Sequence, residues 1–116
     1  MVQEVLSELQ AVQGVRGAAL VAEDGFVVES LRAEGAPEID FLGAAAASAL
    51  SSARGLAQEL DHGAVEEVMV EYPEGPVLLI PLKNGNLLVM LLDSMSSLGR
   101  ARLQLKKSIP RLEKDL

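Results

Sequence analysis

The chain contains no cysteine and no tryptophan, and aromatic residues make up only 3% of its 116 positions. Without cysteine there can be no disulfide framework, no thiolate metal site and no thiol nucleophile. The single histidine, His62, cannot supply the ligand cluster of a zinc centre. We therefore expect an aliphatic core, no metal and no cofactor.

Several sequence patterns that mark enzymes and membrane proteins are also missing. There is no phosphate-binding loop, no GxGxxG fingerprint and no GxSxG nucleophile elbow. No apolar run reaches the roughly 18 residues of a membrane helix, and the N-terminal stretch MVQEVLSELQ lacks the basic and apolar regions of a signal peptide. The sequence thus favours a cytoplasmic protein without membrane insertion.

The few polar residues that could take part in catalysis have simpler interpretations. His62 follows a long predicted helix, where a histidine is favoured by the negative helix end. Glu66 and Glu67 are neighbours in a predicted strand and point to opposite faces, and Asp24 lies in a turn. Arg54 is either a surface arginine, a partner contact or, least expected, an arginine finger. We predict an interaction module and no enzyme.

Charge is unevenly distributed along the chain. The net charge of −7 argues against nucleic-acid binding. Residues 1–97 hold 15 acidic and 4 basic residues, whereas residues 98–116 hold 2 acidic and 6 basic residues. The basic end is interpreted either as a solvated helix face or as a contact surface for an acidic partner or membrane.

Residues 38–60, EIDFLGAAAASALSSARGLAQEL, are the most informative segment of the sequence. Their spacing predicts one helix with two uncharged faces, whereas a surface helix normally has one. The larger stripe consists of Ile39, Leu42, Ala46, Leu50, Ala53, Ala57 and Leu60. The smaller stripe consists of Ala44, Ala45, Ser48, Ser51, Ser52 and Gly55, with Phe41 at one end and Glu59 at the other. We expect the larger stripe to face a sheet and the smaller one to face a second chain.

The remaining elements follow from periodicity and turn signals. We predict helices over 2–13 and from 97 onward, and strands over 15–22, 26–31, 65–72, 77–82 and 86–92. Ser96 or Ser97 is expected to cap the last helix, and Pro110 to kink or divide it. The order α-β-β-α-β-β-β-α predicts a single domain over 1–116. Its expected fold is an α/β three-layer sandwich with a five-stranded, mainly antiparallel sheet and helices on both faces.

Taken in order, these segments resemble the roadblock (dynein light chain) family, in particular its bacterial MglB-like branch. The resemblance is carried by GVRGA at 14–18, EDGFVVES at 23–30, the small-residue helix, VLLIPLKNGNLLVMLLD at 77–93 and SLGRAR at 97–102. It spans nearly the whole chain, although no single motif in it is as specific as a phosphate loop.

The resemblance implies a dimer in which the middle helices pair and the third strands join edge to edge. The implied helix contact consists of Phe41, Ala44, Ala45, Ser48, Ser51, Ser52 and Gly55, and the implied strand contact of Glu67, Val68, Met69, Val70 and Glu71. Glu66, Glu67 and Glu71 bring like charges towards that edge, which is unfavourable unless they splay to solvent.

The resemblance further implies that the dimer binds a small Ras-like GTPase, as a platform or as an activating protein. Charge on the helix is confined to a narrow strip around Asp40, Arg54 and Gln58, and the part with Arg54 and Gln58 is left for such a partner. Two alternatives remain: a purely structural dimer within a larger complex, and a small-molecule sensor, which the scarcity of aromatic and convergent polar residues disfavours. The sequence does not decide between a homodimer and a heterodimer with a paralogue.

Overall fold

The computed structural model describes every residue from 1 to 116 and has the predicted order of elements. The helices are α1 (Val2–Gln10), α2 (Gly43–Leu60) and α3 (Leu98–Lys114). The strands are β1 (Val15–Val21), β2 (Val27–Arg32), β3 (Val68–Val70), β4 (Val77–Pro81) and β5 (Leu87–Leu92). Short 3-10 turns, η1 (Lys83–Gly85) and η2 (Met95–Ser97), precede β5 and α3.

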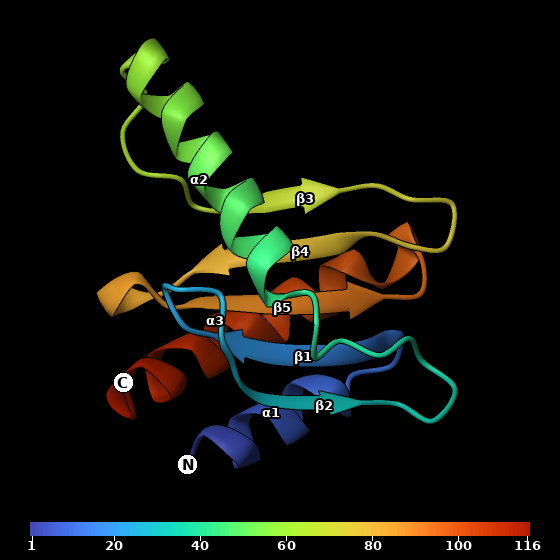
Figure 1. Ribbon diagram of the computed structural model, residues 1–116. Coiled ribbons are helices and arrows are strands. Elements are labelled where there is room, and N and C mark those ends of the chain that lie inside the picture. The colour runs from blue at the N-terminus through green and yellow to red at the C-terminus, as the bar shows by residue number, and fades with distance from the viewer.

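The five strands form one antiparallel sheet in the order β2-β1-β5-β4-β3. Helices α1 and α3 cover one face and α2 lies on the other, so the predicted three-layer arrangement is confirmed (Figure 1). Strands β2 and β3 form the two edges. The predicted Asn84–Gly85 turn between β4 and β5 is also confirmed, since both residues have positive φ angles, 62° and 77°.

The centre of the sheet is apolar on both faces. Every residue of β5 is buried, as its continuous apolar run predicts, because helices cover both of its sides. Strand β1 lies beside β5 and is buried at all positions except Arg16. Function that requires exposed side chains therefore has to lie on the helices, the edges or the loops.

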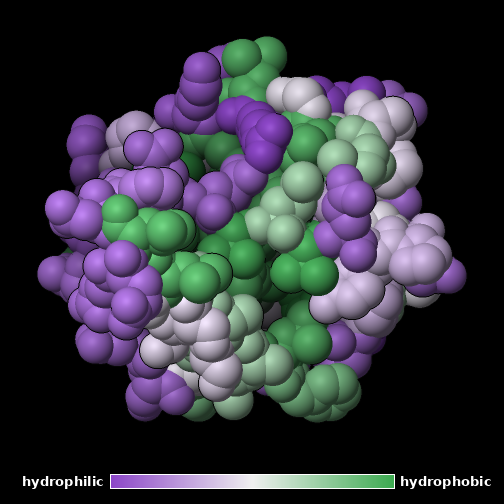
Figure 2. Space-filling model, turned by 90° about the horizontal axis from the view of Figure 1, so that it is seen from above, coloured by the Kyte–Doolittle hydropathy of each residue, from purple (hydrophilic) through white to green (hydrophobic).

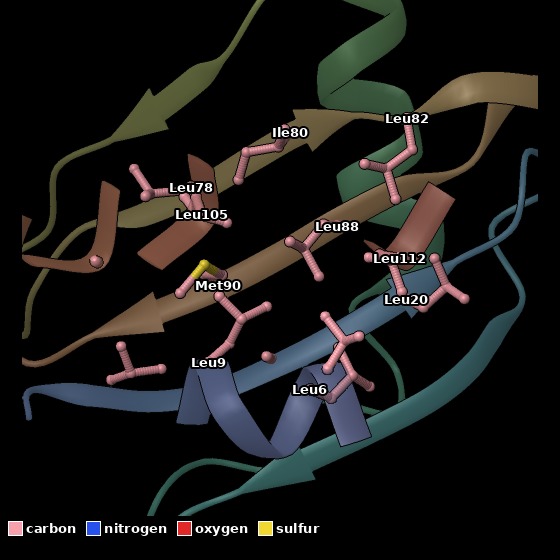
Figure 3. Close-up of a cluster of buried hydrophobic side chains, with 14 of the residues drawn as sticks. Leu6, Leu9, Leu20, Leu78, Ile80, Leu82, Leu88, Met90, Leu105 and Leu112 are labelled. Carbon is pink, nitrogen blue, oxygen red and sulfur yellow. The ribbon is translucent and has the colours of Figure 1, made fainter. Parts of the chain in front are cut away.

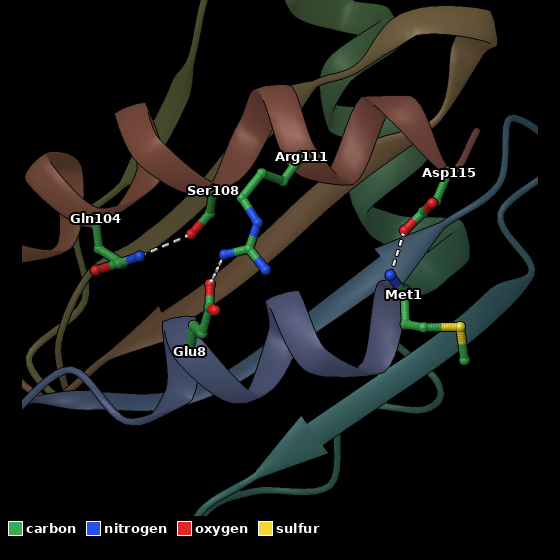
Figure 4. A network of polar contacts seen from close by, with 6 residues as sticks. All are labelled: Met1, Glu8, Gln104, Ser108, Arg111 and Asp115. Atoms are coloured by element: carbon green, nitrogen blue, oxygen red, sulfur yellow. Dashed lines mark hydrogen bonds and ion pairs between the residues drawn. The ribbon is translucent and has the colours of Figure 1, made fainter.

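The larger core lies between the sheet and the α1/α3 layer (Figure 3). Its 15 buried residues come from both helices, from β1, β4 and β5, and from Leu82 just after β4. Leu6, Leu9, Leu78, Leu88, Met90 and Leu112 are among the most enclosed. Along the outer side of this layer, Glu8 pairs with Arg111 and the N-terminal amine of Met1 lies 2.7 Å from the Asp115 carboxylate (Figure 4). Such exposed pairs are screened by solvent and contribute little to stability, so this layer is held mainly by its apolar contacts.

The core on the α2 side is smaller, with 9 buried residues. Helix α2 itself contributes only Ala46 and Leu50 to it, and Ile39 fills the space beside Gly17. The prediction that α2 begins at residue 38 is wrong, because the helix begins at Gly43. The reason is a tertiary contact: a Cβ at Gly43 would overlap the carbonyl oxygen of Gly25, so the first turn rests directly on the β1–β2 turn.

The last helix differs from expectation at two positions. Pro110 does not divide it, since α3 continues to Lys114. Ser97 occupies the N-cap position, as predicted, but its side chain makes no capping hydrogen bond, because its hydroxyl donates a 2.6 Å hydrogen bond to the carboxylate of Asp93. The Asp93 N–H in turn donates to the Gly14 carbonyl at 2.8 Å, so this residue ties the start of α3 to the start of β1.

The Asp93 contacts predict an acid-dependent loss of stability. The Ser97 hydroxyl bond lowers the pKa of the Asp93 carboxyl below its ordinary value. The carboxylate therefore stabilises the fold above its unfolded-state pKa of about 3.9, and this contribution disappears as pH falls through the lower folded-state pKa. We expect Asp93→Asn to lower the Tm at pH 7 and the difference from wild type to shrink below about pH 4.

Thermal melts from about pH 7 to pH 2.5, followed by circular dichroism, measure this difference. Glu34→Gln is the matched control, because Glu34 is exposed in a loop and takes part in no hydrogen bond or ion pair. A Tm difference between Asp93→Asn and wild type that stays constant over this range would show that the carboxylate charge does not contribute.

Candidate functional site

Helix α2 is longer than the sheet beneath it. It starts above the middle of the sheet, crosses β4 and β3, and its C-terminal half projects beyond the β3 edge (Figure 1). Only Gly43, Ala46 and Leu50 of this helix are buried, and all three lie in its first half. The expectation that Leu60 packs on the sheet is therefore wrong: Leu60 is 58% exposed and Leu56 is 65% exposed.

The small-residue stripe predicted to meet a second chain is open to solvent. Its exposed members are Phe41, Ala44, Ala45, Ser48, Ser51, Ser52 and Gly55. A Cβ built on Gly55 would have no neighbouring atom within 4 Å, so packing within the chain does not require glycine there. Glycine inside a helix costs about 0.8–1 kcal/mol relative to alanine. Folding of the single chain thus does not explain why residue 55 is a glycine.

An apolar groove runs beside the stripe, between α2 and the strands below it. It has a volume of about 280 Å³ and all nine lining residues are hydrophobic. They are Leu42, Ala45, Ala46, Ala49, Val70, Tyr72, Val77, Leu79 and Val89. Seen from the side of β3 and the free end of α2, hydrophobic residues gather around a hollow in the middle of this face, with hydrophilic residues around them (Figure 2).

Strand β3 borders this groove and leaves one edge of the sheet open. It pairs only with β4, so its other side presents unpaired backbone donors and acceptors. The strand is shorter than the predicted 65–72, and the ladder ends where Val70 faces Val77. Pro76 precedes Val77 and has no N–H to extend the ladder. Of the predicted strand contact, Glu67 and Glu71 therefore flank β3, while Val68, Met69 and Val70 form it.

Glu67 does not point along the open edge. Its carboxylate binds the guanidinium of Arg102 on α3, with a 3.4 Å hydrogen bond from Nε to Oε1 and a shorter one from the terminal nitrogen. This contact also raises the pKa of Arg102. The repulsion expected between acidic side chains at the β3 edge is thus relieved at Glu67, while Glu66 and Glu71 remain exposed. Sequence reasoning missed the pair because its partners are 35 positions apart.

Arg54 and Gln58 lie on another side of α2 and are exposed. Both line a shallow pocket of about 300 Å³ with Gly63, Val65 and Pro81, and Arg54 also lines one of about 200 Å³ with Glu23, Gly85 and Leu87. Neither pocket shares a lining residue with the apolar groove. The predicted partner strip therefore lies away from the groove, but it adjoins the predicted dimer stripe, because Ser51 of the stripe lines the smaller Arg54 pocket.

The other polar candidates have structural roles or none. The backbone of Asp61 and His62 caps α2, with His62 N–H donating to the Ala57 carbonyl at 3.0 Å, so the cap is made by main chain and not by the imidazole. The Asp24 carboxylate accepts a 3.0 Å bond from the Phe26 N–H, as expected of a turn former. No group of three or more His, Cys, Asp or Glu residues is placed to hold a metal ion.

None of the helices combines the length and the apolar character needed to cross a membrane.

Half of the basic residues at the C-terminal end are engaged within the chain. Arg102 and Arg111 pair with Glu67 and Glu8, and Arg100 donates to the Gln13 carbonyl at 2.7 Å. The three lysines of α3, Lys106, Lys107 and Lys114, are exposed. The basic end thus serves first to fasten α3 to the rest of the fold.

Comparison with known proteins agrees with this architecture. Residues 1–92 match the Roadblock/LC7 domain family. The uncharacterized protein MJ0310 of Methanocaldococcus jannaschii is 31% identical over 113 residues, or 97% of either chain. The gliding protein MglB from Thermus thermophilus is 25% identical with a TM-score of 0.84, over 97% of this chain and 86% of that one.

A solved structure described as MglB with a tetrameric arrangement is 26% identical with a TM-score of 0.85, over 97% of this chain and 85% of that one. The family match covers both edge strands, α2 and the apolar groove, and the structural likeness extends through α3. The chain therefore belongs to the Roadblock/LC7 family, in its MglB-like branch.

Proposed function

We propose that residues 1–116 act as a single roadblock-like domain that pairs with a second copy of itself and, as a dimer, binds a small Ras-like GTPase to regulate it. The observation that carries this proposal is the unsupported half of α2 beside an empty apolar groove. A helix end with two exposed leucines and a groove lined only by hydrophobic residues are complementary features of one surface.

Two-fold symmetry brings these features together. If a two-fold axis relates the two β3 edges, the two α2 helices run antiparallel to each other across the dimer. The C-terminal half of each helix then projects over the sheet of the other copy, towards its groove. Leu56 and Leu60 gain the apolar cover that their own sheet does not provide. Burial of each leucine favours association by less than the about 1.5–3 kcal/mol of a fully exposed leucine side chain, because each is already partly covered in the single chain.

The stripe and the strand edge complete the proposed contact. Small side chains at Ala45, Ser48, Ser52 and Gly55 allow two helix backbones to approach closely, which also explains the glycine. The open β3 edges can hydrogen-bond to each other and extend the sheet across both copies. Self-association is in line with the tetrameric arrangement described for an MglB.

Support for a GTPase partner comes from the chain's membership of the Roadblock/LC7 family, because resemblance to that family implies a role beside Ras-like GTPases. In the proposed dimer, Arg54 and Gln58 remain accessible because they lie away from the groove. We infer that this strip contacts the GTPase and that the dimer acts by positioning the catalytic groups of the GTPase itself.

The test measures single-turnover GTP hydrolysis by a Ras-like GTPase that co-purifies with this chain, with increasing amounts of the wild-type chain or of Arg54→Ala. If Arg54 only contacts the partner, we expect the variant to need a higher concentration and to reach the same maximal rate. If Arg54 is an arginine finger, the maximal rate itself falls by about 10³-fold or more. Binding without any change in hydrolysis would instead indicate a structural scaffold, and failure to recover any Ras-like GTPase with this chain would contradict the proposal.

A further inference from the structure

Arg16 is the one residue of the inner strand β1 that is not fully buried. The register between β1 and β5 shifts at this position: Val15 faces Leu92 and Gly17 faces Leu91, leaving Arg16 as the extra residue of a β-bulge. Bulges redirect side chains relative to the regular alternation. Here the bulge brings Arg16 to a groove on the α2 face of the sheet, where it lies with Pro37, Tyr72 and Leu91. Glu74 lines the same groove but forms no ion pair with Arg16.

This second groove adjoins the apolar one. It has a volume of about 300 Å³ and shares Tyr72 and Val77 with the groove proposed to receive the second copy. The side chain of Arg16 takes part in no ion pair or hydrogen bond within the chain. A partner that fills the apolar groove therefore meets an unpaired guanidinium at its far end.

No other basic residue is in a position to serve this surface. The four basic residues before α3 are Arg16, Arg32, Arg54 and Lys83. Arg32 is bound to the Ala36 carbonyl and Glu38, and Lys83 lies in η1 between β4 and β5. Arg54 lines pockets that exclude Tyr72 and Val77. Arg16 is thus the cation available on this side.

The end of α2 needs such a cation. Its last turn contains no basic residue, and the helix C-terminus carries a partial negative charge to which the carboxylates of Glu59 and Asp61 add. Glu59 also continues the small stripe, because it follows Ala45, Ser48, Ser52 and Gly55 at alternating spacings of three and four residues. On an antiparallel pair of α2 helices, this end approaches the Phe41 end of the other copy.

We propose that Arg16 is the counter-ion for the C-terminal end of α2 from a second copy, with Glu59 as its main partner. This inference rests on the proposed dimer and assigns to it a reciprocal pair of ionic contacts, one on each side of the two-fold axis. Two such contacts fix the helices in register, which small apolar side chains alone do not.

A charge-swap experiment by analytical ultracentrifugation tests the pair. Arg16→Glu and Glu59→Arg should each raise the dimer dissociation constant by about tenfold or more, and the double variant should return it to within about threefold of wild type. The wild-type constant should also rise with salt, and less so in Arg16→Gln. Arg54→Glu and Glu34→Arg are matched charge reversals outside the contact and should leave the constant unchanged.

The outcomes distinguish failure of the Arg16–Glu59 ion pair from failure of the proposed dimer. A monomeric wild type would overturn the proposed dimer. A dimeric wild type whose constant is unaffected by Glu59→Arg, an exposed helix position where folding is not at risk, would overturn only the ion pair. Weakening by both single reversals without recovery in the double variant would show that Arg16 and Glu59 do not meet.

Discussion

A Gly55→Arg variant is expected to be monomeric at concentrations where the wild-type chain is dimeric. In the single chain, a side chain at this position meets only solvent, because no atom lies within 4 Å of its Cβ. Arginine is also the better helix former by somewhat less than about 1 kcal/mol, so the fold should be at least as stable as before. In the proposed dimer the same side chain would separate two closely packed helices and bury an unpaired charge.

The expected effect on association is large. Burying an unpaired charge or separating the helices costs several kcal/mol, and about 3 kcal/mol corresponds to a more than hundredfold rise in the dissociation constant. Light scattering behind a size-exclusion column, over a dilution series of both proteins, measures it. Circular dichroism of the same samples checks that the helical content is kept.

Gly99→Arg is the matched control for this experiment. Gly99 is also a helical glycine with no atom within 4 Å of its Cβ, but it lies on α3, on the opposite face of the sheet. We expect this control to remain dimeric. Ser48→Arg, on the same stripe as Gly55, should reproduce the dissociation. If Gly55→Arg and Ser48→Arg dimerise like wild type, then the assignment of this stripe to the interface is incorrect.

Periodicity was sufficient to predict the order of elements and the main core. The apolar run of β5 indicates a strand covered on both sides, and the helical spacing in α1 and α3 indicates which side chains face it. These features depend on residues close together in the chain. The exposed small-residue stripe on α2 was accessible to the same reasoning, because a helix with two uncharged faces is visible in the sequence, and its assignment to a dimer contact stays a prediction.

The start of α2 and the length of α2 that the sheet covers could not be predicted in this way. The first turn of α2 is set by contact between Gly43 and Gly25, which no local signal reveals. Leu60 has the correct helical spacing for the sheet, but the sheet ends at β3 before the helix does. Periodicity gives the direction of a side chain without showing whether anything lies there. The bulge that redirects Arg16 depends on pairing with β5, and sequence reasoning therefore overlooked this residue.

Leu50→Ala is expected to cause the largest loss of monomer stability on the α2 side. Leu50 is 1% exposed and is the largest α2 side chain in the smaller core, where the helix otherwise contributes Ala46. Removing a buried leucine side chain costs about 2–5 kcal/mol, with the higher values where the surroundings cannot close the cavity. Total stabilities are commonly about 5–15 kcal/mol, so this is a substantial part of the whole.

Dimerisation would obscure this measurement, because a chain that associates when folded has a stability that depends on its concentration. Urea titrations should therefore compare Leu50→Ala and Leu56→Ala in the monomeric Gly55→Arg background. Leu56 is on the same helix but 65% exposed, so its truncation should change the free energy of unfolding by less than about 0.5 kcal/mol.

In the dimeric background the ranking of the two leucines should reverse. Leu56→Ala should then weaken association, because the proposed partner groove loses a side chain that fills it, whereas Leu50 faces its own sheet and affects association only through folding. A cost below about 1 kcal/mol for Leu50→Ala would mean that α2 is not anchored through this residue. Equal effects of Leu56→Ala in both backgrounds would mean that the free end of α2 has no apolar partner. In the proposed dimer, helix α2 thus uses Leu50 for folding and Leu56 for assembly, and each side chain can be removed separately.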